Sequence, residues 1–174
     1  MATPPLSELE QRHKWLVDHI PYRIRAVLTG LPIDPPWHVP LVAQWMQAER
    51  LANDCAWAAV HEGRLSAMRW LIEFIGIKES KGRAVPSKNE RRTDTFIDSF
   101  PGGILHPLDG ADAKKLADLW KGCSQAGGHA THGTEHPDTS DTRLAEALTI
   151  ILGHLERTIY AEHKINLFDA VRGK

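Results

Sequence analysis

The chain has 174 residues, 42% of them hydrophobic, so it is long enough to bury a core as one domain without disulfides or a structural metal. Its formal net charge of -1 at pH 7 excludes a general electrostatic attraction to nucleic acid or to an anionic membrane. The two cysteines, Cys55 and Cys123, lie far apart without a CxxC spacing, which indicates free thiols in a reducing compartment.

The N-terminal sequence MATPPLSELEQRHKW lacks the basic and apolar regions of a secretory signal, and the chain contains no run of about 18 apolar residues. We therefore expect a cytoplasmic protein with no membrane span.

A first helix is predicted from Leu6 to Leu31. Ser7 and Glu10 have the spacing of a capping box at its start. Pro21 lacks an N–H and clashes with the preceding turn, so it should kink the helix or split it in two. The apolar residues recur at steps of three, four and seven: Leu9, Trp15, Leu16, Ile20, Ile24, Val27 and Leu28.

A second helical region follows a stiff connector over residues 31–36, which contains three prolines. Pro40 is suited to the first helical turn. One apolar stripe runs through Leu41, Trp45, Ala48, Ala52, Cys55, Ala56 and Ala59, and another through Leu65, Met68, Leu71, Ile72 and Ile75. At Gly63, between the stripes, the chain either turns or continues as one helix, and the sequence leaves both alternatives open.

Less regular structure is expected in the middle of the chain. Residues 78–92 lack periodicity and predict a mobile basic loop, and residues 93–109 are expected to be mostly irregular. Asp109 is a candidate cap for a short helix that ends at about Cys123, with Ala113, Leu116, Leu119 and Trp120 facing inward. A second loop, rich in Gly, His and Thr, is predicted over residues 126–139.

The clearest helix is predicted from Ser140 to Phe168. One face of it carries Leu144, Leu148, Ile151, Leu155 and Ile159. No signal for a β-hairpin is evident. The sequence therefore predicts an all-α fold: a single domain over residues 1–174, built as a bundle of four to six helices with two irregular loops. Most of the six tryptophans are expected in the core or in an interface.

The histidine-rich loop is a candidate metal site. His129, His132 and His136 lie within eight residues, with Cys123 upstream, and imidazole and thiolate are natural zinc ligands. The spacing matches no established zinc pattern. The alternative is that His129 and His132 bond to backbone groups in a tight glycine loop, and on that interpretation we expect no cofactor.

The predicted basic loop is a candidate phosphate-binding surface. It holds six basic residues against two acidic ones, a local charge of +4, so contact with RNA is one interpretation and a solvated loop is the other. Aromatic residues are not interleaved with the basic ones, so base stacking has no platform there.

Two segments resemble HEPN-like helical proteins of bacteria. One is Leu119-Trp120-Lys121-Gly122-Cys123-Ser124-Gln125-Ala126-Gly127-Gly128-His129, in which a helix ends near a Ser and is followed by a His, after an earlier helix that carries Glu49 and Arg50. The resemblance covers about 90 residues loosely. It implies a bundle of four or five helices, often a homodimer, with a ligand or loop site at Ser124, His129 and His132.

The other segment is Arg157-Thr-Ile-Tyr-Ala-Glu-His163, which is similar to the Arg-x4–6-His motif of the ribonucleases in that family. The resemblance implies a metal-independent endoribonuclease in which Arg157 stabilises phosphate charge and His163 acts as acid or base. The residue after the Arg is Thr158, where the family usually has another polar residue. Six positions on an ideal helix leave the two side chains about 120° apart, so a dimer interface would be needed to bring them together.

Three functional hypotheses follow. The first is a non-enzymatic helical protein that dimerises through an apolar helix face and binds a protein or a small ligand. The second is a HEPN-like ribonuclease that uses Arg157 and His163. The third is a metal-binding protein that uses His129, His132 and His136.

Overall fold

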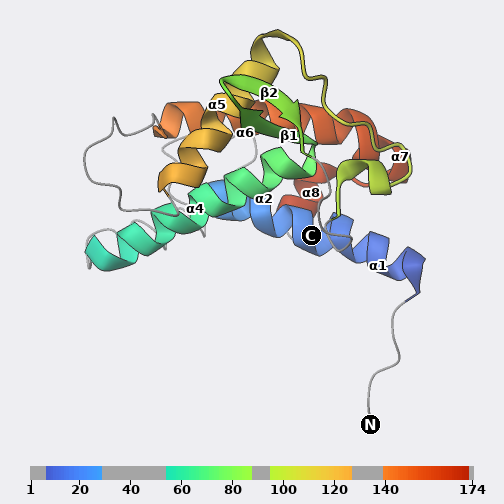
Figure 1. Ribbon diagram of the computed structural model, residues 1–174. Coiled ribbons are helices and arrows are strands. Elements are labelled where there is room, and N and C mark those ends of the chain that lie inside the picture. The colour runs from blue at the N-terminus through green and yellow to red at the C-terminus, as the bar shows by residue number, and fades with distance from the viewer. Residues whose placement is uncertain (1–6, 29–53, 88–94, 127–138, 173–174) are drawn as a thin grey trace.

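The described part of the chain is mostly helical, with one small sheet (Figure 1). The computed structural model describes residues 7–28, 54–87, 95–126 and 139–172. In chain order the elements are α1 Glu8–Lys14, the π turn η1 Trp15–His19, α2 Ile20–Leu28, α4 Asp54–Phe74, β1 Ile77–Ser80, β2 Arg83–Pro86, the 3-10 turn η2 Ile97–Ser99, α5 Gly110–Ala126, α6 Asp141–Leu155, the π turn η3 Glu156–Tyr160, α7 Ala161–His163 and α8 Leu167–Arg172. The predicted helical fold is confirmed at this level, and the two strands are a minor addition to it.

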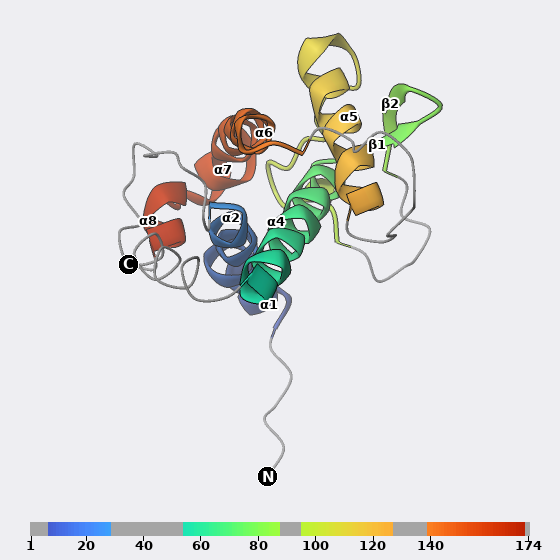
Figure 2. The ribbon, with the colours of Figure 1, turned by 90° about the vertical axis from the view of Figure 1, so that its left-hand side faces the viewer.

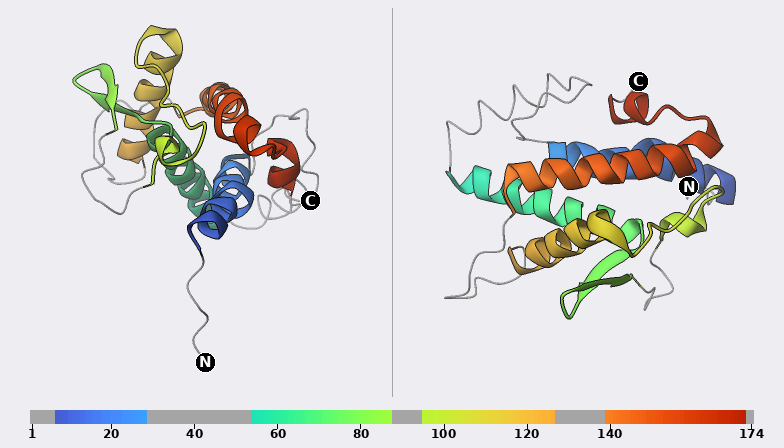
Figure 3. Two further views of the ribbon diagram at one scale, coloured as in Figure 1. Left: turned by 90° about the vertical axis from the view of Figure 1, so that its right-hand side faces the viewer. Right: turned by 90° about the horizontal axis from the view of Figure 1, so that it is seen from above.

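The helices pack around α4. Figure 2 shows α4 between α2 on one side and α5 on the other, with α6 above α2. Figure 3 shows the hairpin outside α5 and the short helix α8 at the opposite edge, next to α2. The core is built from apolar stripes of these helices, and its largest fully buried apolar members are Tyr160, Phe74, Leu16, Ile20, Ile24, Leu65, Met68, Leu71, Ile72 and Ile75.

The first helix continues through Pro21 and does not split there. Ser7 and Glu10 form the predicted capping box at the start of α1. Before the proline the helix widens into the π turn η1, where the Ile20 N–H donates to the Trp15 carbonyl five residues earlier. The next donor in this spacing would be residue 21, and proline has no N–H. The π turn therefore accommodates the proline, and α2 follows without a break.

The region around Gly63 is continuous helix. α4 runs from Asp54 to Phe74 through this glycine, so of the two alternatives the turn is excluded. The helix ends at Phe74, and two residues later Gly76 has a φ of +95°, a backbone conformation that L side chains rarely adopt.

The expectation of an irregular loop over residues 78–92 is wrong for residues 78–86. Strands Ile77–Ser80 and Arg83–Pro86 pair in antiparallel register as a hairpin. Lys81 and Gly82 form its turn, with φ of 53° and 77°. Positive φ at both central residues is typical of a type I′ turn, for which Asn-Gly is the usual sequence signal. Because the turn has lysine in place of asparagine at its first position, the sequence does not show the usual signal for this hairpin.

Residues 95–109 are mostly irregular, as the sequence predicts, with the single short turn η2. This segment is held to the end of α4 by a hydrogen bond from the His106 N–H to the Ile75 carbonyl, at 2.9 Å. α5 then begins at Gly110 and extends to Ala126. The predicted inward residues Ala113, Leu116 and Leu119 are buried, and Trp120 is half-buried.

The last long helix ends earlier than the sequence predicts. α6 continues through η3 and α7 to His163, where Lys164 adopts a left-handed conformation with φ of 53°. A separate helix, α8, then packs beside α2 and buries Leu167 and Val171. The expected continuation to Phe168 is therefore wrong. The predicted inner face is buried throughout, at Leu144, Leu148, Ile151, Leu155 and Ile159.

Several predicted features lie outside the described residues. They are the connector over residues 31–36, the helical stripe from Leu41 to Ala52, residues 88–92 of the basic segment, and residues 127–138 of the histidine-rich loop. No helix in the described parts of the chain combines the length and the apolar character that crossing a bilayer requires.

Candidate functional site

A groove lies between α1 and α7 at one end of the bundle. It has a volume of about 530 Å3 and a mostly apolar lining. One wall is formed by α1 and η1, and His163 of α7 contributes to the other. The lining residues are Leu9, Glu10, Arg12, His13, Lys14, Val17, Asp18 and His163.

Two π turns hold the helices that form these walls. η1 separates α1 from α2, and η3 separates α6 from α7. The Tyr160 hydroxyl of η3 donates to the Leu16 carbonyl of η1 at 2.7 Å. In the five-residue spacing that carbonyl would be the partner of Pro21, which has no N–H to donate. Tyr160 therefore satisfies an acceptor that the proline leaves without a donor, and it joins the two turns from which α1 and α7 extend.

The α1 wall presents apolar surface without burying any residue of its own. Leu9 is 75% exposed. Leu9, His13 and Val17 are spaced four residues apart, so they share one face of the helix. α1 is the N-terminal end of the continuous helix that runs on through η1 and α2, and the core residues of this helix lie in η1 and α2. The groove therefore exposes an apolar helix face that buries none of its residues within the described structure.

His163, one of the two predicted catalytic residues, lines this groove. Its Nε2 atom is buried and has no hydrogen-bond partner among the described residues. Buried polar atoms in folded proteins are nearly always hydrogen-bonded. His163 is thus a polar residue of this wall with a ring nitrogen whose hydrogen bonding the described residues leave unsatisfied.

Arg157, the other predicted catalytic residue, is exposed and has different neighbours. Its Nη1 atom lies 3.2 Å from the position that a Cβ on Gly153 would take. Its charge contributes to lowering the pKa of His154, after burial and the charge of His106. These neighbours belong to α6, whereas His163 faces α1. No described contact joins Arg157 to His163 within one chain.

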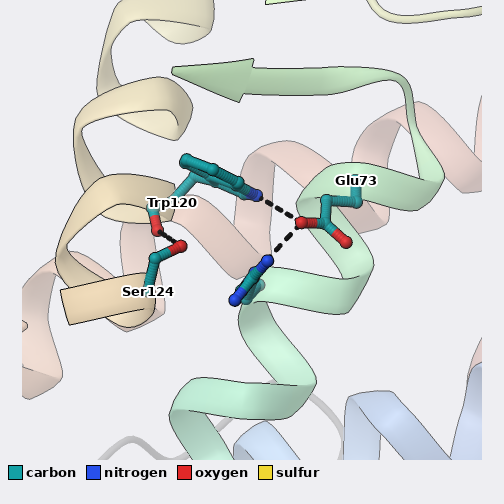
Figure 4. A network of polar contacts seen from close by, with 4 residues as sticks. Glu73, Trp120 and Ser124 are labelled. Carbon is teal, nitrogen blue, oxygen red and sulfur yellow. Dashed lines mark hydrogen bonds and ion pairs between the residues drawn. The ribbon is translucent and has the colours of Figure 1, made fainter. Parts of the chain in front are cut away.

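Ser124, predicted as a ligand or loop residue, is engaged within its own helix (Figure 4). Its hydroxyl donates to the Trp120 carbonyl at 2.8 Å. The Trp120 indole N–H donates to Glu73 Oε1 at 2.8 Å, and Glu73 Oε1 also accepts from Arg69 Nε at 3.0 Å. The Arg69 guanidinium lies 5.2 Å from the centre of the Trp120 ring. This network fastens α4 to α5.

The proposed metal ligands His129, His132 and His136 lie outside the described residues, and so do the predicted loop-site residues His129 and His132. Within the described ranges, no group of three or more His, Cys, Asp or Glu side chains could hold a metal ion.

The strongly perturbed titratable groups are structural. Burial raises the pKa of the Cys123 thiol to about 12, although the charge of Arg69 opposes the shift, so this free thiol is not a nucleophile at neutral pH. Burial also raises the pKa of Tyr160 well above its usual value of 10. Tyr160 therefore keeps the proton that it donates to Leu16.

Arg64 of α4 is a buried cation that sequence reasoning missed. Its side chain is fully buried, and its Nη2 atom donates to Asp141 Oδ1 of α6 at 2.6 Å. Its Nε and Nη1 atoms have no acceptor among the described residues. The signal is the position of Arg64, four residues before Met68 and seven before Leu71, which places a cation on the apolar stripe of α4.

Comparison of the chain with protein-family models, with curated proteins and with solved structures finds no match. The HEPN-like resemblance therefore stays a prediction.

Proposed function

We propose that this chain is a non-enzymatic helical binding protein that works as a homodimer, and that a second copy docks in the α1 groove. The observation that supports this most is α1 itself. It buries none of its seven residues, yet Leu9 of α1 and Val17 of η1 line an apolar groove. Packing against a second copy removes this exposed apolar surface from water.

The charges of α1 favour a second α1 as the partner. Its first turn carries Glu8 and Glu10, and its last turn carries Arg12, His13 and Lys14. When two copies lie antiparallel about a two-fold axis, the acidic turn of each meets the basic turn of the other. The helix dipoles are then also antiparallel, and the apolar residues of both copies come together.

The dimer is tested by measuring the mass of the protein in solution with light scattering over a range of concentrations. We expect wild-type protein to reach twice the 19.5 kDa of the chain. Leu9→Glu should shift it to monomer, because the substitution places a charge in the apolar contact. Ile104→Glu is the matched control, since Ile104 is 63% exposed and does not line the groove, and it should leave the dimer intact.

Monomeric wild-type protein at high concentration would refute the dimer. So would a Leu9→Glu protein that dimerises as strongly as wild type. Loss of the dimer in Ile104→Glu alone would move the interface away from α1.

A ribonuclease is the second candidate, and the position of His163 favours it. In the proposed dimer the unpartnered His163 side chains of both copies lie at or near the interface, where the Arg157 of one copy has to approach the His163 of the other. Wild-type protein should then degrade RNA in the presence of EDTA, and His163→Ala should abolish the cleavage. His19→Ala is the control, because His19 is exposed and does not line the groove. Absence of cleavage across varied RNAs leaves the binding function.

The metal hypothesis for His129, His132 and His136 has its own test. Protein purified without a histidine tag should contain about one equivalent of metal by elemental analysis if the loop binds zinc. A protein partner and a cytoplasmic location stay predictions from the sequence.

A further inference from the structure

We propose that the start of α6 is a binding site for a small carboxylate, held by the buried guanidinium of Arg64. This inference gives the proposed binding function a ligand, and it stands on Arg64 and α6 alone. It therefore holds or fails independently of the dimer.

The guanidinium of Arg64 has unused hydrogen-bonding capacity. Arginine has five N–H donors and cannot lose its charge in a protein. Of the three nitrogens, only Nη2 has a described partner, Asp141 Oδ1, while Nε and Nη1 are buried without an acceptor in the described part of the chain. A fully buried cation with unpaired donors calls for a further anionic acceptor.

The end of a helix provides the second half of the site. Asp141, the partner of Arg64, is the first residue of α6, a helix of 15 residues. The first N–H groups of a helix have no partner within it, and they carry the positive end of the helix dipole. Arg64 therefore lies where backbone donors and a partial positive charge also gather, which is the usual arrangement of an oxyanion site.

The sum of the charges around Arg64 favours a ligand with one negative charge over a ligand with two. The carboxylate of Asp141 balances the charge of Arg64, so only the helix dipole, about half an elementary charge, remains in excess. That small excess suits a single negative charge better than the two charges of a phosphate. Asp141 is 33% exposed while Arg64 is fully covered, so the ligand enters beside Asp141.

His61, one turn before Arg64 on α4, reports on the site. Burial lowers the pKa of His61 and the positive charge of Arg64 lowers it further, while the charges of Asp141 and Glu62 act in the opposite direction. A bound anion adds a negative charge near this ring, which raises the pKa of His61.

The experiment is an NMR titration of the full chain with acetate, with sodium chloride at matched ionic strength as the control. We expect acetate to shift the Arg64 Nε–H resonance saturably and to raise the pKa of His61, and chloride to do neither. Asp141→Asn should tighten acetate binding on the order of tenfold, because it removes a like charge beside the ligand. Arg64→Gln should abolish binding. Arg69→Gln, which removes an exposed charge from the same helix, should leave it unchanged.

The outcomes separate the alternatives. If neither wild type nor Asp141→Asn binds acetate saturably, water alone occupies the donors of Arg64 and the proposal is overturned, even where Arg64→Gln fails to fold. Tighter binding of inorganic phosphate than of acetate would overturn the assignment to a carboxylate. An equal response to chloride would also overturn the proposal, because ionic strength alone would then explain the change in the Arg64 and His61 signals.

Discussion

At the scale of single residues, three buried side chains with polar groups in the described part of the chain bond to backbone carbonyls. Tyr160 donates to Leu16, Thr158 donates to the His154 carbonyl at 2.7 Å, and His154 Nε2 lies 2.6 Å from the Ile104 carbonyl. Because a carbonyl can only accept, Nε2 of His154 carries the proton and donates it. This bond ties the irregular segment before α5 to the long C-terminal helix.

His154 should make the stability of the protein depend on pH. Burial lowers its pKa below the usual 6.5, and the charges of His106 and Arg157 lower it further, while the bond to Ile104 opposes them. The unfolded chain therefore takes up a proton at a higher pH than the folded chain does. The contribution of His154 to the free energy of unfolding is therefore fully present above its usual pKa of 6.5 and is lost as the pH falls below that value.

The variant His154→Gln tests this dependence, because glutamine keeps an N–H donor for Ile104 and cannot titrate. Urea denaturation at neutral and at mildly acidic pH should show a smaller loss of stability in the variant than in wild type. Part of the loss should remain, since the pKa of His61 is lowered as well. Equal losses in both proteins would contradict the role of His154.

At the scale of the elements, distortions of the helices shape the molecule as much as the helices do. The π turn η1 precedes Pro21, which has no N–H to donate, and in η3 the Thr158 hydroxyl donates to the His154 carbonyl. η1 separates α1 from α2, and η3 separates α6 from α7. The hairpin depends on two residues at positive φ, Lys81 and Gly82, in its turn.

Gly63 is a position where α4 should gain from a side chain. A Cβ on this residue would meet nothing within 4 Å, and the residue lies inside a helix of 21 residues. Gly63→Ala should therefore raise the free energy of unfolding by about 0.5–1 kcal/mol, because alanine loses less backbone entropy in a helix than glycine. Thermal or urea denaturation measures the change.

Gly103→Ala should change the free energy of unfolding in the opposite direction to Gly63→Ala. A Cβ there would lie only 1.8 Å from the Ile97 carbonyl oxygen, so the turn around η2 has to shift. We expect a loss of about 2 kcal/mol or more. A neutral or stabilising result for this variant would mean that residues 97–103 rearrange at little cost.

At the scale of the whole molecule, contacts between the two ends of the described chain hold the bundle together. Arg25 of α2 donates to the carbonyls of Ala170 and Val171 in α8, at 3.3 and 2.9 Å. The Tyr160 hydroxyl reaches Leu16, 144 residues earlier in the chain. α2 is thus joined to α8, and η1 is joined to η3.

Tyr160→Phe should weaken this closure. The substitution keeps the ring but leaves the Leu16 carbonyl without its donor, which should cost about 1–2 kcal/mol in the free energy of unfolding. Tyr22→Phe is the control, because Tyr22 is 59% exposed, and it should change stability little. Equal stability of Tyr160→Phe and wild type would show that water replaces the hydroxyl at Leu16.

The apolar periodicity of the sequence determined the helices and their buried faces. The stripe from Leu144 to Ile159 and the residues Leu116 and Leu119 are inside, because burying an apolar face is a local demand that each helix carries in its own sequence. The capping box of Ser7 and Glu10 is equally local. The same reasoning missed the hairpin, because Lys81 adopts a conformation that its residue type seldom takes.

Only the tertiary structure decided which side chains from distant parts of the sequence come into contact or line the same groove. Arg64 and Asp141 are 77 residues apart in the chain. Leu9 and His163, which are also far apart in the sequence, line the same groove. No spacing along the sequence encodes such contacts, since they depend on how whole helices pack and on where Lys164 ends the long C-terminal helix. The apolar periodicity of each segment thus determines that the protein is helical, whereas its candidate sites depend on contacts between segments that are distant in the sequence.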